Sequence, residues 1–143
     1  MQPLLSFLFL VLMMTSTRPG YAAEAKWTLP PLEQSKAYQD FKMRPDTEQS
    51  KLLYLIDRFQ DSGVQVGYNS VFFDAPLAAR FARWFLLRFY RGETVDQWLV
   101  KWCYRSVPSG DLIWCKFPDG TQKLSMPVLM GELEALNQTL KKV

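Results

Sequence analysis

The chain has 143 residues, of which 48% are hydrophobic and 15% aromatic, so it can bury a core of one-domain size without help from a metal. The formal net charge is only +3, with acids mixed among the bases, which is too mild for a nucleic-acid-binding protein. Histidine is absent, and with it the commonest general base, metal ligand and partner of a catalytic serine or cysteine. We therefore expect no cofactor, no metal and no nucleic acid.

Residues 1–25 have the layout of a secretory signal peptide. An apolar run from Leu4 to Met14 is followed by the helix-breaking pair Pro19-Gly20 and by small residues that permit cleavage after Ala22 or Ala25. No Lys or Arg precedes the run, and the alternative is a buried N-terminal helix. At 11 residues the run is too short to span a bilayer, so we expect no transmembrane anchor and a periplasmic or secreted mature protein.

Residues 26–45 form an N-terminal arm, which Pro30-Pro31 interrupts and which either docks on the domain or stays mobile. Residues 46–143 are expected to form one small domain. Its first helix has an N-cap at Asp46-Thr47, carries apolar residues at helical spacing and ends at Ser62-Gly63.

Two further helices follow a short strand. The alternating segment Val64–Asn69 predicts that strand. The next helix, Ala75–Tyr90, follows an N-cap at Asp74 and is apolar around most of its circumference, so we expect it to be the central helix. A third helix begins at the capping box formed by Thr94 and Gln97.

The last third of the sequence predicts a hairpin and a final helix. The strands are Leu112–Phe117 and Thr121–Ser125, joined by a tight turn at Pro118-Asp119-Gly120. The helix runs from Pro127 to about Leu140. The predicted fold is α+β, with about four helices packed on a small antiparallel hairpin or sheet in a single domain.

The only cysteines are Cys103 and Cys115. In an oxidising compartment an even count favours a disulfide bond, and Cys115 approaches Cys103 if its face of the strand meets the third helix. Two buried free thiols are the alternative. Two thiols twelve positions apart without histidine do not make a zinc site.

The densest polar stretch contains Ser106, Ser109, Gly110 and Asp111, with Lys116 shortly after. A catalytic interpretation makes Ser106 or Ser109 a nucleophile and Lys116 its base, because serine needs a nearby base at neutral pH. Turn formation explains the same serine, proline, glycine and aspartate residues more simply. We favour a turn whose exposed residues form a candidate binding surface.

A second candidate surface lies on the helix at residues 75–90. Arg80, Arg83, Arg88 and Arg91 fall on one arc, and Trp84 lies one turn from both Arg80 and Arg88. Guanidinium groups stack on indole rings, so we expect these arginines to stack on Trp84. The arc is either a solvated stripe or a basic-aromatic patch for an anionic partner, such as a lipid head group, a cell-wall polymer or an acidic protein.

The sequence contains three further short motifs, Ser62-Gly63-Val64-x-Val66-Gly67-Tyr68-Asn69, Ala78-Ala79-x-Phe81 and Ser106-x-x-Ser109-Gly110-x-x-x-Trp114-x-Lys116-x-x-Asp119-Gly120. With these motifs the chain resembles the YfeK-like family of small exported bacterial domains of unknown function. Two departures from the family pattern are Phe81, where the family tends to have histidine, and Tyr68-Asn69-Ser70 in place of Arg-Asn-Gly. The resemblance implies export and fold, and it implies no activity.

Together these observations predict a non-enzymatic, exported binding or interaction domain of the bacterial cell envelope. Its expected partner is an envelope protein or a cell-wall component. A more specific alternative is an inhibitor or immunity protein against a cell-wall hydrolase or toxin, by analogy with other small exported proteins. A Ser/Lys-type hydrolase is the enzymatic alternative.

Overall fold

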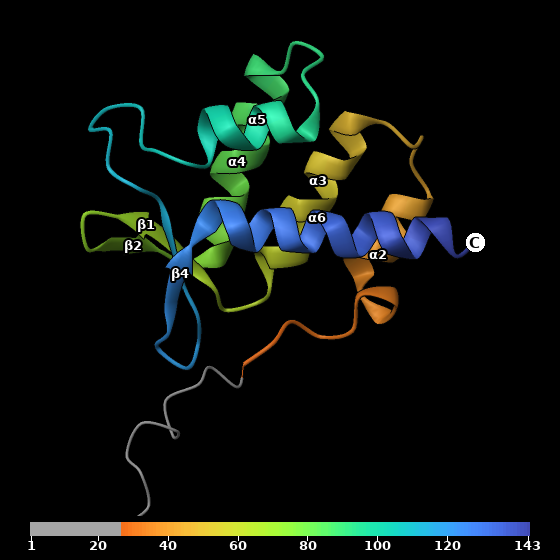
Figure 1. Cartoon of the computed structure of the whole chain (residues 1–143), viewed down its shortest axis with the longest axis horizontal. Coiled ribbons are helices and arrows are strands. Elements are labelled where there is room, and N and C mark those ends of the chain that lie inside the picture. The colour runs from red at the N-terminus through yellow and green to blue at the C-terminus, as the bar shows by residue number, and fades with distance from the viewer. Residues whose placement is uncertain (1–26) are drawn as a thin grey trace, which may run out of the picture.

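A computed structural model describes residues 27–143 (Figure 1), so the predicted signal peptide and its cleavage sites lie outside the described residues. The helical elements are η1 (Leu32–Gln34), α2 (Lys36–Lys42), α3 (Glu48–Gln60), α4 (Ala75–Phe89), α5 (Val95–Trp102) and α6 (Ser125–Lys141). The strands are β1 (Gln65–Tyr68), β2 (Val71–Phe73), β3 (Trp114–Lys116) and β4 (Gln122–Leu124).

The predicted α+β class is confirmed, with a four-stranded antiparallel sheet in the order β2-β1-β3-β4. Figure 1 places this sheet at one end of the molecule and the helices beside it. The described residues form five α-helices, one more than predicted, because the N-terminal arm contributes α2. Strand β2 was missed, since Val71–Phe73 is short and leads directly into a strongly helical segment.

The turn between β1 and β2 is strained. Asn69 and Ser70 both have positive φ angles, of 52° and 63°. A two-residue hairpin turn of this kind matches the twist of its strands, and asparagine followed by glycine suits it best. Serine in the second position carries the steric cost of the left-handed region, about 1–2 kcal/mol.

Gly67, in the middle of β1, is required by the close approach of β2. A Cβ atom built on Gly67 would lie 1.9 Å from the carbonyl oxygen of Val71. The β1–β2 hairpin can therefore coil tightly only because residue 67 has no side chain.

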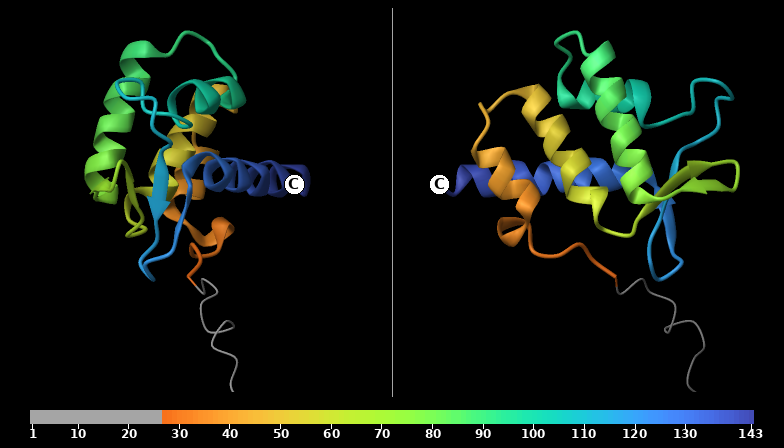
Figure 2. Two further views of the ribbon diagram at one scale, coloured as in Figure 1. Left: turned by 60° about the vertical axis from the view of Figure 1, so that its left-hand side comes forward. Right: turned by 180° about the vertical axis from the view of Figure 1, so that it is seen from behind.

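The central helix is α3, and the prediction that residues 75–90 form it was wrong. Helix α3 contacts α2, α4, α5 and α6, and Figure 2 shows it between α2 and α4. Tyr54 and Leu55 of α3 are buried in the main core, which also includes Leu86, Leu99 and Leu136. Helix α4 is apolar around most of its circumference, but only one side of it faces α3, so apolar residues on its other side stay at the surface.

The N-terminal arm docks on the domain. Its helix α2 packs along α3 and buries Ala37, Tyr38 and Phe41 in the main core. The Ser35 hydroxyl caps α2 by accepting a hydrogen bond from the Tyr38 backbone N–H at 3.1 Å. The described part of the arm, residues 27–45, thus supplies core side chains to the domain predicted for residues 46–143.

Local helix signals agree well with the structure. The Thr94 side chain accepts a hydrogen bond from the Gln97 backbone N–H, and the Gln97 side chain accepts one from the Thr94 backbone N–H, so the predicted capping box is confirmed.

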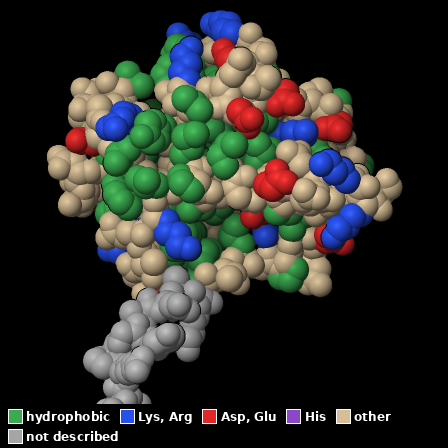
Figure 3. All heavy atoms as spheres, viewed as in Figure 1, with side chains coloured by type: hydrophobic (Ala, Val, Ile, Leu, Met, Phe, Trp, Pro, Cys, Tyr) green, Lys and Arg blue, Asp and Glu red, His purple; other side chains and the backbone are tan. Residues whose placement is uncertain are grey.

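Figure 3 shows hydrophobic side chains gathered over the first half of α6 and the adjoining loop. Val128, Leu129 and Met130 of that half are partly buried and pack against the core clusters, so this patch is the margin of the core.

Candidate functional site

The outer face of α4 carries a stripe of exposed apolar side chains. Figure 2 shows α4 on the outside of the molecule in the view from behind. Leu77 is 51% exposed, Phe81 64%, Trp84 53% and Leu87 70%. A helix normally turns such side chains toward a core, so this exposed apolar surface makes α4 a candidate interaction surface.

Arginines lie among these apolar side chains. Arg80 and Arg88 are exposed, and the Arg88 guanidinium lies over the Trp84 ring, 6.0 Å from its centroid. The predicted arginine–tryptophan stacking is therefore present for Arg88. We call the set Leu77, Arg80, Phe81, Trp84, Leu87 and Arg88 the α4 face.

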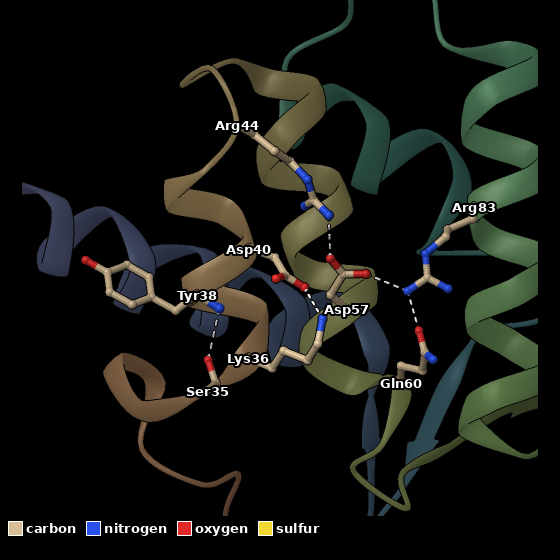
Figure 4. Close-up of polar contacts among 8 residues, drawn as sticks. All are labelled: Ser35, Lys36, Tyr38, Asp40, Arg44, Asp57, Gln60 and Arg83. Atoms are coloured by element: carbon tan, nitrogen blue, oxygen red, sulfur yellow. Dashed lines mark hydrogen bonds and ion pairs between the residues drawn. The ribbon is translucent and has the colours of Figure 1, made fainter.

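Arg83 was predicted to belong to the same surface, but the structure turns it inward. Its guanidinium donates to the Asp57 carboxylate at 2.5 Å and to the side-chain oxygen of Gln60, both on α3 (Figure 4). Asp57 also accepts from Arg44, which lies just after α2, at 2.9 Å. Arg83 is therefore a structural link between α4 and α3.

The turn at residues 106–111 is built as turn chemistry predicts. The Ser106 backbone N–H donates to the Asp111 carbonyl, and the Gly110 N–H donates to the Ser106 carbonyl, both at 2.7 Å. Ser109 Oγ accepts from the Asp111 N–H at 3.4 Å, and Gly110 has a positive φ of 73°. These contacts account for the residue types without a catalytic role.

The structure gives the Ser/Lys interpretation no support. Ser106 is only 6% exposed, and its buried hydroxyl has no hydrogen-bond partner among residues 27–143. Lys116 Nζ lies instead over the Phe72 ring, 5.6 Å from its centroid. Neither Ser106 nor Ser109 hydrogen-bonds to Lys116 in the part of the chain that the structure describes.

A concave surface on the sheet was missed by sequence reasoning. Loop 105–112 lies beside the open face of the sheet, and together they border a shallow, open hollow of about 640 Å³. We call this surface the sheet groove and define it by Phe72, Arg105, Asp111, Trp114, Lys116 and Gln122. Gly110 and Asp111 of the predicted turn surface line it, whereas Ser106 and Ser109 do not. The groove could not be predicted because strand β2, which supplies Phe72, was not predicted.

Cys103 and Cys115 are free thiols in the structure, and the expected disulfide stays a prediction. Cys115 lies on the core-facing side of β3 with Val64 and Phe117, whereas Cys103 follows α5 and packs against the main core cluster. The two side chains pack against different clusters but lie near each other, since besides burial the charge of a Cys115 thiolate contributes to the raised pKa of Cys103. Burial raises the pKa of both thiols to about 12, so both are protonated at neutral pH and are poor nucleophiles.

The raised thiol pKa values predict a loss of stability in alkali. Above the ordinary thiol pKa of 9.0 the unfolded chain loses these protons while the folded chain keeps them up to about pH 12. The free energy of unfolding should then fall by up to about 1.4 kcal/mol per pH unit for each thiol. Burial also raises the pKa of the Tyr54 hydroxyl, which adds to the loss above its ordinary pKa of 10.0.

Urea unfolding at about pH 8.5, 9.5 and 10.5 with reductant present measures this effect, because these values bracket the ordinary thiol titration. The double variant Cys103→Ala/Cys115→Ala should show a shallower fall than the wild type. Equal slopes in the two proteins would contradict the assignment to the thiols.

The described residues contain neither a candidate metal-ion cluster nor a helix able to span a membrane. Residues 27–143 contain no cluster of three or more His, Cys, Asp or Glu side chains able to hold a metal ion. None of the helices in that range is both long and apolar enough to cross a membrane.

Comparisons with protein-family models, with curated proteins and with solved structures find no match to this chain. The resemblance to the YfeK-like family therefore stays a prediction.

Proposed function

We propose that this protein is an exported, non-enzymatic binding domain of the bacterial cell envelope, and that the α4 face docks a protein partner that presents acidic groups. The observation that carries the proposal is the exposed stripe of Leu77, Phe81, Trp84 and Leu87 with arginines beside it. Tryptophan and arginine are the residues most enriched among energetic anchors of protein interfaces.

Charge supports an acidic partner. The sequence contains no Asp or Glu from residue 75 to residue 92, and Arg80 and Arg88 are exposed on the α4 face. Two copies of this chain meeting through α4 would bring arginines against arginines with no carboxylate between them. A partner with acidic groups around an apolar patch instead pairs these arginines and covers the apolar stripe.

The α4 face is also held in place before binding. Arg83 links the inward side of α4 to Asp57 and Gln60 of α3. Phe85 packs edge-on against Trp102 of α5, with ring centroids 4.7 Å apart. A rigid surface loses little conformational entropy on association, so these contacts favour affinity.

Export rests on the layout of residues 1–25. A mature N-terminus at Ala23 or Lys26 is the expected result of cleavage after Ala22 or Ala25. Intact-mass measurement of the protein recovered from the bacterial envelope tests this, and retention of Met1 would contradict it.

Site-specific photo-crosslinking in living bacteria tests the docking surface. A photoreactive residue at Leu87 should give one discrete protein adduct, which the double variant Arg80→Glu/Arg88→Glu removes. The same residue at Met43, which is 87% exposed after α2, is the matched control and should give none. With the partner purified, Trp84→Ala should weaken binding by about thirtyfold, the effect of losing an anchor worth about 2 kcal/mol.

Three outcomes would overturn the proposal. They are an adduct equally strong at Met43, a crosslinked homodimer through Leu87, and arginine-dependent binding to anionic vesicles without any protein adduct. Unchanged urea midpoints of the α4-face variants ensure that a lost adduct reports on the surface and not on unfolding.

A further inference from the structure

The two faces of the sheet differ in what covers them. Successive residues of a strand point to opposite faces. On one face, Val66 and Cys115 pack with Phe117 and with Val128 of α6 in the smaller core cluster. The opposite face carries Phe72, Trp114, Lys116 and Gln122, none of which belongs to either core cluster, and it forms the floor of the sheet groove.

Two aromatic rings lie on this open face with no β1 side chain between them, and the Lys116 ammonium lies over one of them, 5.6 Å from the Phe72 ring centroid. Gly67 of β1 pairs with Phe72 of β2 on one side and with Trp114 of β3 on the other. Because Gly67 has no side chain, nothing on β1 separates the two rings along that row. Both rings are partly exposed, so they offer apolar surface to a ligand lying across the strands.

Cations outnumber acids in the groove. Arg105 and Lys116 line it, against the single carboxylate of Asp111. The Arg105 guanidinium is oriented by a hydrogen bond to the Gly110 carbonyl at 2.9 Å and by the Tyr104 ring. Within residues 27–143 neither cation takes part in an ion pair, so both charges remain available to a ligand.

We propose that the sheet groove is a second binding site, which takes an acidic oligosaccharide through its carboxylate groups and the apolar faces of its rings. Phe72 and Trp114 contact the C–H faces of the sugars, whose hydrogens meet the negative faces of aromatic rings. Arg105 and Lys116 bind the carboxylate by charge-assisted hydrogen bonds.

The remaining polar groups of the groove suit hydroxyl groups. The amides of Asn69 and Gln122 can both donate and accept, and the Asp111 carboxylate accepts from hydroxyl donors. A sugar hydroxyl can donate a hydrogen bond to the Asp111 carboxylate, whereas a phosphodiester group has no hydrogen to donate and repels that carboxylate. A carboxylated sugar therefore fits the groove better than a nucleic acid does.

Isothermal titration calorimetry, whose signal does not depend on Trp114, tests the proposal with trigalacturonate. Its fully methyl-esterified form keeps the same rings without charge and is the matched ligand control. Saturable binding of the acid is expected, with the ester at least tenfold weaker. Lys116→Gln should weaken binding of the acid by about tenfold, the effect of one charge-assisted hydrogen bond, and should leave ester binding unchanged.

Lys123→Gln is the control variant on the same sheet. Lys123 is exposed on β4 and lies opposite Cys115 of β3 in the sheet. Its ammonium lies over the Phe117 ring, so the side chain is on the face away from the groove. This variant should bind trigalacturonate as the wild type does. Trp114→Phe keeps an aromatic ring, and Trp114→Ala should weaken both the acid and the ester.

The proposal is overturned by equal affinities for the acid and the ester, by equal effects of Lys116→Gln and Lys123→Gln, or by no saturation up to about 10 mM, the range of very weak binding. Preferential, Lys116-dependent binding of a single-stranded oligonucleotide would overturn it in favour of a nucleic-acid site. Trp84→Ala on the α4 face should leave sugar binding intact, so this site and the proposed docking surface can fail independently.

Discussion

Replacing Glu132 with alanine is expected to lower the free energy of unfolding by about 3–5 kcal/mol, because it leaves a buried guanidinium without its carboxylate. The Arg58 side chain is only 5% exposed, and its Nε atom lies 2.6 Å from Glu132 Oε1. The same oxygen accepts a hydrogen bond from the Tyr54 hydroxyl at 2.9 Å. Arg58 also donates to the Pro30 carbonyl, so one carboxylate organises contacts among α3, α6 and the N-terminal arm.

Chemical denaturation of matched variants measures this effect. Glu134→Ala removes an exposed carboxylate two residues along the same helix, and should change stability by less than about 0.5 kcal/mol. Glu132→Gln keeps the shape and an accepting oxygen but removes the charge, so its cost should lie between those of the two alanine variants. A cost for Glu132→Ala no larger than that for Glu134→Ala would show that Arg58 finds water or another partner.

The elements that were predictable from the sequence are those specified by neighbouring residues. The capping box at Thr94 lies within four residues of chain, and the structure reproduces it. The hairpin around Asp119 is equally local, since Thr121 N–H donates to its carboxylate at 2.9 Å and this hydrogen bond lowers the pKa of Asp119. Such signals depend on backbone geometry and need no knowledge of the tertiary fold.

What could not be predicted depends on contacts between distant residues. Arg58 and Glu132 are 74 residues apart in the sequence. Each is a charged residue in a helix, and such residues are usually exposed, so neither one alone indicates a buried ion pair. The apolar circumference of α4 did not reveal which side meets α3, since hydrophobic pattern indicates burial only where a helix has one apolar face. The exposed stripe on α4 and the inward turn of Arg83 follow from that packing choice.

The candidate sites show the same division. Arg88 and Trp84 were predicted to stack because they are one helical turn apart, and they do. In the sheet groove Lys116 of β3 contacts Phe72 of β2. This contact could not be predicted, because the sequence pattern did not reveal β2. Register between strands brings such residues together, and only the tertiary structure defines that register.

Asp57→Ala is expected to cost about 2–3 kcal/mol of stability, because it leaves two partly buried guanidinium groups without their shared acceptor. Asp57 is 14% exposed and lies between Arg44 and Arg83, at 2.9 Å and 2.5 Å (Figure 4). Arg44 already has one buried nitrogen without a partner among the described residues, so losing Asp57 would leave it still less satisfied. Asp40→Ala, which breaks only the exposed pair with Lys36, is the control and should cost less than about 1 kcal/mol.

A double-mutant cycle separates the contribution of Arg83 from that of Arg44. Arg83→Met should cost less in the Asp57→Ala background than in the wild type, because its main partner is already gone, whereas additive costs would show that the two residues do not interact. Since Asp57 holds the inward side of α4 on α3, Asp57→Ala should also weaken binding at the α4 face although residue 57 lies outside that face. Affinity is measured at a temperature where the Asp57→Ala variant is fully folded, so that a loss of affinity reports on the position of α4. Unchanged affinity would show that Phe85 and the buried Leu86 suffice to hold the helix in place.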